Sequence, residues 1–172
     1  MAPPHEARFL ALLNEHRAIL HKVAYAYCRD REDRADLVQE MAFALWRSFP
    51  RFDDRVKFST WAYRVAMNVA ISRLRSEGRR VRDTVPIDEL AIEPGGEDPM
   101  LEGASDNMRV LRRLIDRLDG LNRALILLYL DGRTAEEIAE IVGTTPGNVT
   151  TRVNRLRQRL QEEFARLEKE TP

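Results

Sequence analysis

The chain has 172 residues, 44% of them hydrophobic and 33% charged, and its 28 basic residues balance its 28 acidic ones. That length suits one large or two small helical domains. No apolar run approaches the ~20 residues of a membrane span, and the first residues lack the basic and then apolar segments of a signal peptide, so we expect a cytoplasmic protein.

The zero net charge conceals a segregation of charge along the chain. Residues 47–82 carry ten basic and three acidic residues, whereas 83–108 carry eight acidic residues and no basic one. Because the local potential decides contact with phosphates, the basic segments are candidates for nucleic-acid binding despite the neutral total.

Apolar residues recur at helical spacing over residues 6–28 and again over 33–48, which predicts two helices joined by a charged turn. In the second helix Phe43 falls outside the apolar stripe, on the face that carries Asp36, Gln39 and Glu40. An aromatic side chain with a polar rim is typical of the centre of a protein interface, so this face is a candidate docking site. A solitary surface phenylalanine is the alternative.

The loop FPRFDDRVKF precedes a third predicted helix, which Ser59 would cap and which would run from 60 to about 76. Between the two apolar sides of this helix lies a narrow polar strip of Arg64, Asn68 and Arg75. Together with Trp61 and the following EGRRVR, the strip offers a basic and aromatic surface that can follow a nucleic-acid backbone and stack on unpaired bases. Membership of Trp61 in the core is the alternative.

Residues 83–108 read as a flexible acidic linker, since they contain prolines and glycines and have no apolar period. Two further helices are expected over 110–118 and 121–130, each from its apolar spacing. The fold class expected is therefore all-α, with two small helical domains joined by the linker.

The stretch from Thr134 to Leu160 predicts a helix-turn-helix. Thr134 and Glu137 have the spacing of a capping box, and Gly143 stands where a helix ends in a left-handed residue. Thr145 can cap a second helix with Pro146 at its first position. Because this turn separates two capped helices, a DNA-binding unit is favoured over a plain amphipathic helix packed in a bundle.

The outer face of this second helix is polar and basic, with no acidic residue between 146 and 161. Side chains of these types can meet base edges in a major groove or contact phosphates. The candidate residues are Asn148, Thr150, Thr151, Arg152, Asn154, Arg155 and Arg159.

The sequence shows no arrangement expected of an enzyme or a metalloprotein. Cys28 is the chain's single cysteine, and its spacing from His16 and His21 is not that of a structural zinc site. There is no phosphate-cradling glycine loop and no acid and base pair in a pocket-forming motif. We therefore expect no catalytic residue, no metal and no cofactor.

Three segments together resemble the extracytoplasmic-function sigma factors, the promoter-specificity subunits of bacterial RNA polymerase. DLVQEMAFALW is similar to the family's core-binding helix, FSTWAYRVAMNVAISRLR to the segment that opens and reads the −10 element, and TAEEIAEIVGTTPGNVTTRVNRLRQRL to the domain that reads the −35 element. The segments occur in the family's order. Asp119 and Gly120 depart from it where a proline is common, and Asn148 departs where a threonine is usual.

The resemblance implies a role for each part of the chain. Residues 1–82 would form a region 2-like domain, 83–108 an acidic linker threading a basic channel of the polymerase, and 109–172 a region 4-like domain. Asp36, Gln39, Glu40 and Phe43 would meet core polymerase. The −10 element would be contacted by Phe52, Lys57, Phe58, Trp61, Arg64, Asn68 and Arg75. Promoter DNA, core polymerase and an anti-sigma factor are the implied partners.

Two other functions remain open from the sequence. The chain could act as a stand-alone DNA-binding regulator that uses only its C-terminal domain, or as a helical adaptor that binds protein alone. A pull-down with core polymerase separates the sigma factor from both, and a duplex-binding assay separates the regulator from the adaptor.

Overall fold

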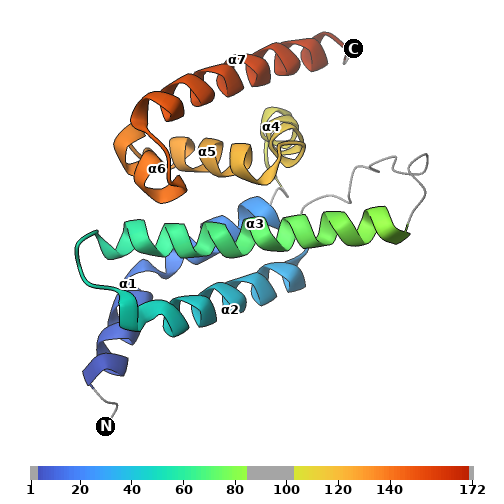
Figure 1. The fold of residues 1–172 in the computed structure, drawn as a ribbon. Helices are drawn as coiled ribbons and strands as arrows, with labels where there is room; N and C mark the ends of the chain where they lie inside the picture. Colours follow the sequence, from blue (N-terminus) through green and yellow to red (C-terminus); the bar gives the residue numbers. More distant parts are fainter. Residues whose placement is uncertain (1–3, 85–102, 171–172) are drawn as a thin grey trace. The chain divides into compact units, whose positions relative to one another are not determined.

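A computed structural model describes residues 4–84 and 103–170, and within these ranges the chain is helical and contains no strand (Figure 1). The elements are α1 (Pro4–Tyr27), α2 (Arg31–Ser48), the short 3-10 helix η1 (Phe49–Arg51), α3 (Phe58–Thr84), α4 (Asp106–Asp116), α5 (Gly120–Leu130), α6 (Ala135–Val142) and α7 (Pro146–Glu170). The all-α class is confirmed. None of the described helices combines the length and the apolar character needed to cross a membrane.

The helices form two compact units, which divide between Glu77 and Gly78. The predicted acidic linker lies mostly outside the described residues, which resume at 103. Its first two residues, 83–84, end α3, and its last three, 106–108, begin α4.

In unit 1 the apolar positions of the helices are buried, along one stripe of α1 and of α2 and on both apolar sides of α3. The fully covered side chains include Val23 of α1, Leu37, Met41 and Leu45 of α2, and Tyr63, Ala66 and Met67 of α3. Burying a side chain of leucine or methionine size contributes ~1.5–3 kcal/mol, so these stripes supply the main driving force for the packing. The apolar spacing read from the sequence thus marks the core side of all three helices.

All three helices of unit 1 begin earlier than the sequence predicts, and α1 does so at Pro4 instead of residue 6. Helix α2 begins at Arg31, two residues before the predicted start, because the Asp30 carboxylate accepts hydrogen bonds from the backbone N–H groups of Glu32 (2.9 Å) and Asp33 (3.1 Å). Helix α3 begins at Phe58, so Ser59, the predicted cap, lies inside the helix. Phe58 is only 7% exposed, and its burial favours an earlier start than local capping would.

Helix α3 is also longer than predicted, since it continues to Thr84. No proline interrupts the sequence before Pro86, and Arg73 forms an ion pair with Glu77 one turn further on. A single glycine, Gly78, costs an exposed helix only about 1 kcal/mol and does not end it.

In unit 2 the starts of α4 and α5 have side-chain caps. Ser105 accepts a hydrogen bond from the N–H of Met108, and Asp119 accepts one from the N–H of Asn122 at 3.0 Å. The end of α4 is closed by the buried Arg123, whose Nη2 donates to the carbonyl oxygens of Asp116 (2.6 Å) and Leu118 (3.1 Å). Asp119, where the family often has a proline, therefore serves here as the cap of α5.

The predicted helix-turn-helix is present as α6 and α7. The N–H of Thr134 donates to Glu137 at 2.8 Å, the N–H of Glu137 donates to Oγ1 of Thr134 at 3.2 Å, and Gly143 adopts the left-handed conformation with φ 77°. Thr145 Oγ1 accepts from the N–H of Asn148 at 3.3 Å, which caps α7. Its inner stripe is buried at Val149, Val153, Leu156 and Leu160. Further along α7, Phe164 and Leu167 are half-buried.

Candidate nucleic-acid interface

The outer face of α7 presents every residue that the sequence predicted for DNA contact by the helix-turn-helix. All are exposed: Asn148, Thr150, Thr151, Arg152, Asn154, Arg155 and Arg159. Their exposure follows from the helical repeat, because the buried stripe of Val149, Val153 and Leu156 holds the opposite side of the helix against α4, α5 and α6. The first turns of α7 are thereby open to a groove of DNA.

The exposed side chains of α7 differ in their contacts. Arg152 Nη2 donates to Oδ1 of Asn122 at 3.2 Å, and Arg159 Nε donates to Glu163 at 3.1 Å. Arg155, in contrast, forms no hydrogen bond or ion pair with any described residue. Arg155 is thus available for an external acceptor, whereas a phosphate would compete with Glu163 for Arg159.

The start of α7 is shaped by short local hydrogen bonds. Oγ1 of Thr150 donates to the carbonyl oxygen of Pro146 at 3.1 Å, and Nδ2 of Asn148 donates to Oγ1 of Thr144 at 3.2 Å. The Arg157 guanidinium lies over the ring of Tyr129, with Cζ 5.1 Å from the centroid, and so covers part of α5. These contacts orient the polar side chains before any ligand arrives.

A cluster of aromatic rings, which we call the aromatic cluster, joins η1, the following loop and the start of α3. It consists of Phe49, Phe52, Phe58 and Trp61, whose ring centroids lie 5.1–6.5 Å apart. Phe49 and Phe58 are buried, while Phe52 and Trp61 are half-buried. The cluster therefore belongs partly to the core of unit 1 and partly to its surface, and Trp61 is neither fully in the core nor fully exposed.

The remaining residues predicted to contact the −10 element stand just before α3 or along it. Lys57, Asn68 and Arg75 are exposed, and Arg64 is half-buried. Arg64, Asn68 and Arg75 stand at intervals of four and seven along α3 and so share one face of the helix. The polar strip thus runs along α3 away from the half-covered rings, which pack against the buried Phe58.

The candidate docking face of α2 is exposed throughout, at Asp36, Gln39, Glu40 and Phe43. Phe43 is 63% exposed, and Trp46, one turn further along the same helix, is 40% exposed. The angular position of Phe43 outside the apolar stripe was predicted from the sequence and is confirmed. Together, these two aromatic side chains expose more apolar surface than a solitary phenylalanine would.

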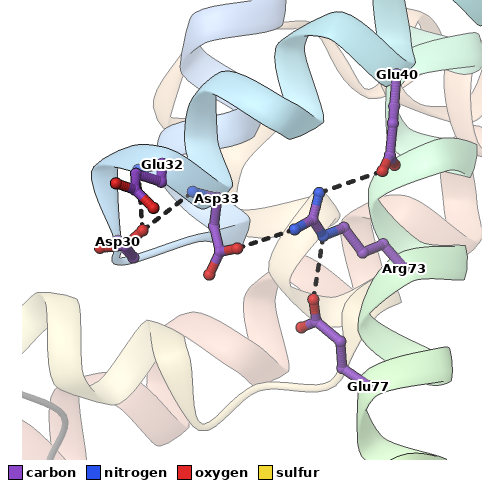
Figure 2. Close-up of polar contacts among 6 residues, drawn as sticks. All are labelled: Asp30, Glu32, Asp33, Glu40, Arg73 and Glu77. Carbon is purple, nitrogen blue, oxygen red and sulfur yellow. Dashed lines mark hydrogen bonds and ion pairs between the residues drawn. The ribbon is translucent and has the colours of Figure 1, made fainter.

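The side chain of Arg73 links α3 to α2 through ion pairs with carboxylates, one of which belongs to the candidate docking face (Figure 2). Its guanidinium contacts Asp33 at 3.1 Å and Glu40 at 3.4 Å, both on α2, and Glu77 at 3.1 Å on its own helix. Burial lowers the pKa of Arg73, but the hydrogen bond to Glu77 and the charges of Glu40, Cys28 and Glu77 together outweigh it and leave the pKa above its ordinary value. Sequence reasoning missed Arg73, for which the spacing to Glu77 was the single visible sign.

Unit 2 is thus a helix-turn-helix with a polar, basic outer face, and unit 1 is a helical unit with a half-exposed aromatic cluster beside a basic strip. The geometry is that of a helical protein with two candidate surfaces for nucleic-acid contact. The sequence matches the family model of sigma-70 region 2 over residues 12–80 and that of sigma-70 region 4 over residues 108–160.

Individual relatives agree with these matches. The ECF RNA polymerase sigma-E factor of Escherichia coli (strain K12) is 34% identical over 149 residues, which cover 80% of this chain and 78% of that protein. The ECF RNA polymerase sigma factor SigE of Mycolicibacterium smegmatis is 28% identical over 93% of this chain, which spans 63% of that relative's length. The chain belongs to the extracytoplasmic-function sigma factors, a family of promoter-recognition subunits of RNA polymerase.

A solved structure extends the likeness to three dimensions. The sigma factor RpoE from Bartonella quintana, solved in complex with the anti-sigma factor NepR, has a TM-score of 0.64 and 28% identity to this chain. The alignment covers 91% of this chain and 94% of that one.

Proposed function

We propose that this chain binds core RNA polymerase, reads the −35 and −10 elements of its promoters and helps to open the DNA. The observation that carries the proposal is the open outer face of α7 in a chain whose other unit matches sigma-70 region 2. A stand-alone regulator would need only unit 2. The second matched unit favours the polymerase subunit, which uses both.

The −35 element would be read by the N-terminal turns of α7 in the major groove. Arg155 can pair bidentately with guanine, and Asn154 can pair with adenine. Arg152 and Arg159 would contact phosphates and set the register of the helix on the duplex. This division follows from their contacts, since Arg155 is uncommitted among the described residues while Arg159 is held toward Glu163.

The −10 element would be read as single-stranded DNA at the aromatic cluster. Stacking a base on an aromatic ring contributes ~1–3 kcal/mol and needs an accessible ring face. Phe52 and Trp61 are half-buried, so each keeps part of its ring exposed while the buried Phe58 supports them. The phosphates and the polar base edges would be contacted by Lys57, Arg64, Asn68 and Arg75.

Core polymerase would dock on the exposed face of α2. Phe43 would be the central anchor, with Asp36, Gln39 and Glu40 as its polar rim. Asp33, Glu40 and Glu77 share Arg73, so the acidic rim is partly neutralised and ordered before docking. Polymerisation chemistry would belong to the partner, with no catalytic residue in this chain.

Two further elements of the proposal concern regulation and the linker. One structural relative was solved with an anti-sigma factor, which supports control of this chain by such a protein in the cytoplasm. The acidic residues of 83–108 would thread a basic channel of the polymerase, a proposal that rests on their charge alone.

Run-off transcription with purified core polymerase on a promoter library tests the proposal. We expect the chain to direct initiation at a subset of templates that share two sequence elements, and Arg155→Ala to change the base preference at the upstream one. Core polymerase alone is the control. If the chain binds duplex DNA but does not associate with core polymerase or direct initiation, it is a stand-alone regulator instead.

A further inference from the structure

Asp54 lies in the loop between η1 and α3, which comprises residues 52–57 and carries two of the proposed −10 contacts, Phe52 and Lys57. Among the described residues, Asp54 is the one non-glycine residue with a positive φ, 63°. An aspartate tolerates this left-handed conformation better than most residues, but the conformation is intrinsically disfavoured and persists when surrounding contacts hold it. A contact that holds Asp54 therefore sets the path of the loop.

Arg8 of α1 provides such a contact from 46 residues away in the sequence. Its Nη2 lies 2.6 Å from both carboxylate oxygens of Asp54. The same guanidinium lies 5.9 Å from the ring centroids of both Phe49 and Phe52, within reach of a cation–π interaction. Arg8 thus holds the loop at two points, the Phe52 ring and the Asp54 carboxylate.

The loop has its own local turn as well. Asp53 accepts a hydrogen bond from the N–H of Arg55 at 3.2 Å and pairs with its Nε at 2.9 Å. These contacts join residues two apart, so they shape the loop without fixing where it lies on unit 1. The tie to Arg8 is of a different kind, because it anchors the loop to a separate helix of the same unit.

We infer that Arg8 is a positioning residue for promoter reading, because it holds residues 52–57 in the shape in which Phe52 and Lys57 meet the −10 strand. The inference rests on the proposed function of this loop. Arg8 itself need not touch DNA. Its side chain is 50% exposed and that of Asp54 is 60% exposed, and such surface ion pairs add little to global stability. Loss of the pair should therefore affect DNA reading more than folding.

The test compares Arg8→Ala with Arg17→Ala in holoenzyme formed with core polymerase. Arg17 is an exposed arginine on the same helix and forms no hydrogen bond or ion pair with another described residue. Templates selected by the wild-type chain are varied base by base in the −10 and, separately, in the −35 element. Affinity for core polymerase and the midpoint of thermal unfolding are measured alongside.

We expect Arg8→Ala to reduce discrimination among −10 variants about two- to fivefold, as suits a surface ion pair, and to leave −35 discrimination and core affinity unchanged. Arg17→Ala should match the wild type. Asp54→Asn, which removes the charge but tolerates the left-handed conformation, should reproduce the defect from the loop side, and the double variant should be no worse than Arg8→Ala. Arg8→Lys should recover part of the discrimination. Raising the salt concentration should shrink the difference.

The contrary outcomes distinguish a failure of the positioning role from a failure of the proposed function. Unchanged −10 discrimination in Arg8→Ala and Asp54→Asn, with a wild type that does discriminate, overturns the positioning role alone. An equal loss at both promoter elements, or a loss of core affinity, also overturns it, because the effect would then be general. If the wild type shows no −10 preference at all, it is the proposed function of the loop that fails.

Discussion

Thr134 and Glu137 exchange hydrogen bonds at the start of α6, each side chain accepting from the backbone N–H of the other residue, at 2.8 and 3.2 Å. The pair satisfies backbone donors that the first turn of a helix otherwise leaves without partners. It also fixes the point at which α6 begins, and with it the position of the turn that leads to α7.

The stability of unit 2 should therefore depend on this pair. Thr134→Ala is expected to lower the free energy of unfolding by about 1 kcal/mol, the usual effect of losing a helix cap. Chemical denaturation followed by circular dichroism measures the change. Thr151→Ala, which alters an exposed threonine inside α7, is the control and should leave stability nearly unchanged. Equal stability of all three proteins would show that the cap contributes nothing.

Arg73 should stabilise unit 1, because its guanidinium neutralises Asp33, Glu40 and Glu77 and its side chain is only 18% exposed. Arg73→Gln leaves those carboxylates without their shared cation and should cost roughly 1 kcal/mol in unfolding free energy, less at high salt. Arg75→Gln, two residues along and exposed, is the matched control. If Arg75→Gln lowers the free energy of unfolding equally, the effect comes from the overall charge of α3 and not from the ion pairs of Arg73.

The thiol of Cys28 should react slowly in the folded protein. Burial raises its pKa above the ordinary 9.0, while the nearby Arg73 opposes the shift. Since the thiolate is the reactive species, a thiol-specific reagent at neutral pH should modify native protein at least about tenfold more slowly than denatured protein. Similar modification rates in native and denatured protein would contradict the burial of the thiol.

The same shift makes the stability depend on pH. Because the pKa of Cys28 is higher in the folded protein, the contribution of this group to stability is complete below pH 9.0 and is lost as the pH rises through the folded value.

Phe43→Ala should weaken binding to core polymerase by roughly 1–3 kcal/mol, as expected for an aromatic anchor at the centre of an interface. The fold should remain nearly intact because the side chain is 63% exposed. Fluorescence anisotropy with labelled protein measures the affinity. Leu10→Ala removes a comparably exposed apolar side chain from α1 and should bind like the wild type. Equal affinity for Phe43→Ala would reject the docking face.

Arg155 and Arg159 should differ in what they contribute to binding of the −35 element. Arg155→Ala should cost ~1–3 kcal/mol on the preferred sequence and relax the preference at one base position. Arg159→Ala should weaken binding to all DNA sequences about equally and reduce the slope of log affinity against log salt concentration by roughly one unit. The reduction should be smaller to the extent that Glu163 already pairs with this arginine. A panel of single-base variants at two salt concentrations compares them. Identical profiles for the two variants would reject the division.

Much of unit 2 was predictable from the sequence because its determinants are local. The capping box, the left-handed Gly143 and the cap at Thr145 each depend on residues three or four apart, and all three are present. The exposed face of α7 follows from the helical repeat in the same way. The resemblance added the assignment of faces to polymerase and DNA, which periodicity alone does not supply.

The sequence by itself determined the helices, their inner stripes and the family, since these depend on residue type and spacing along one helix. Tertiary structure alone decided which distant side chains meet. Arg8 reaches Asp54 across 46 residues and Arg73 reaches Asp33 across 40, and no periodic pattern encodes either pair. Tertiary structure also decided that Phe58, which the sequence places at the end of a loop, is buried, so that α3 begins at this residue and earlier than predicted. These outcomes depend on how whole helices pack, because burial is a property of the surrounding surface and not of the residue alone.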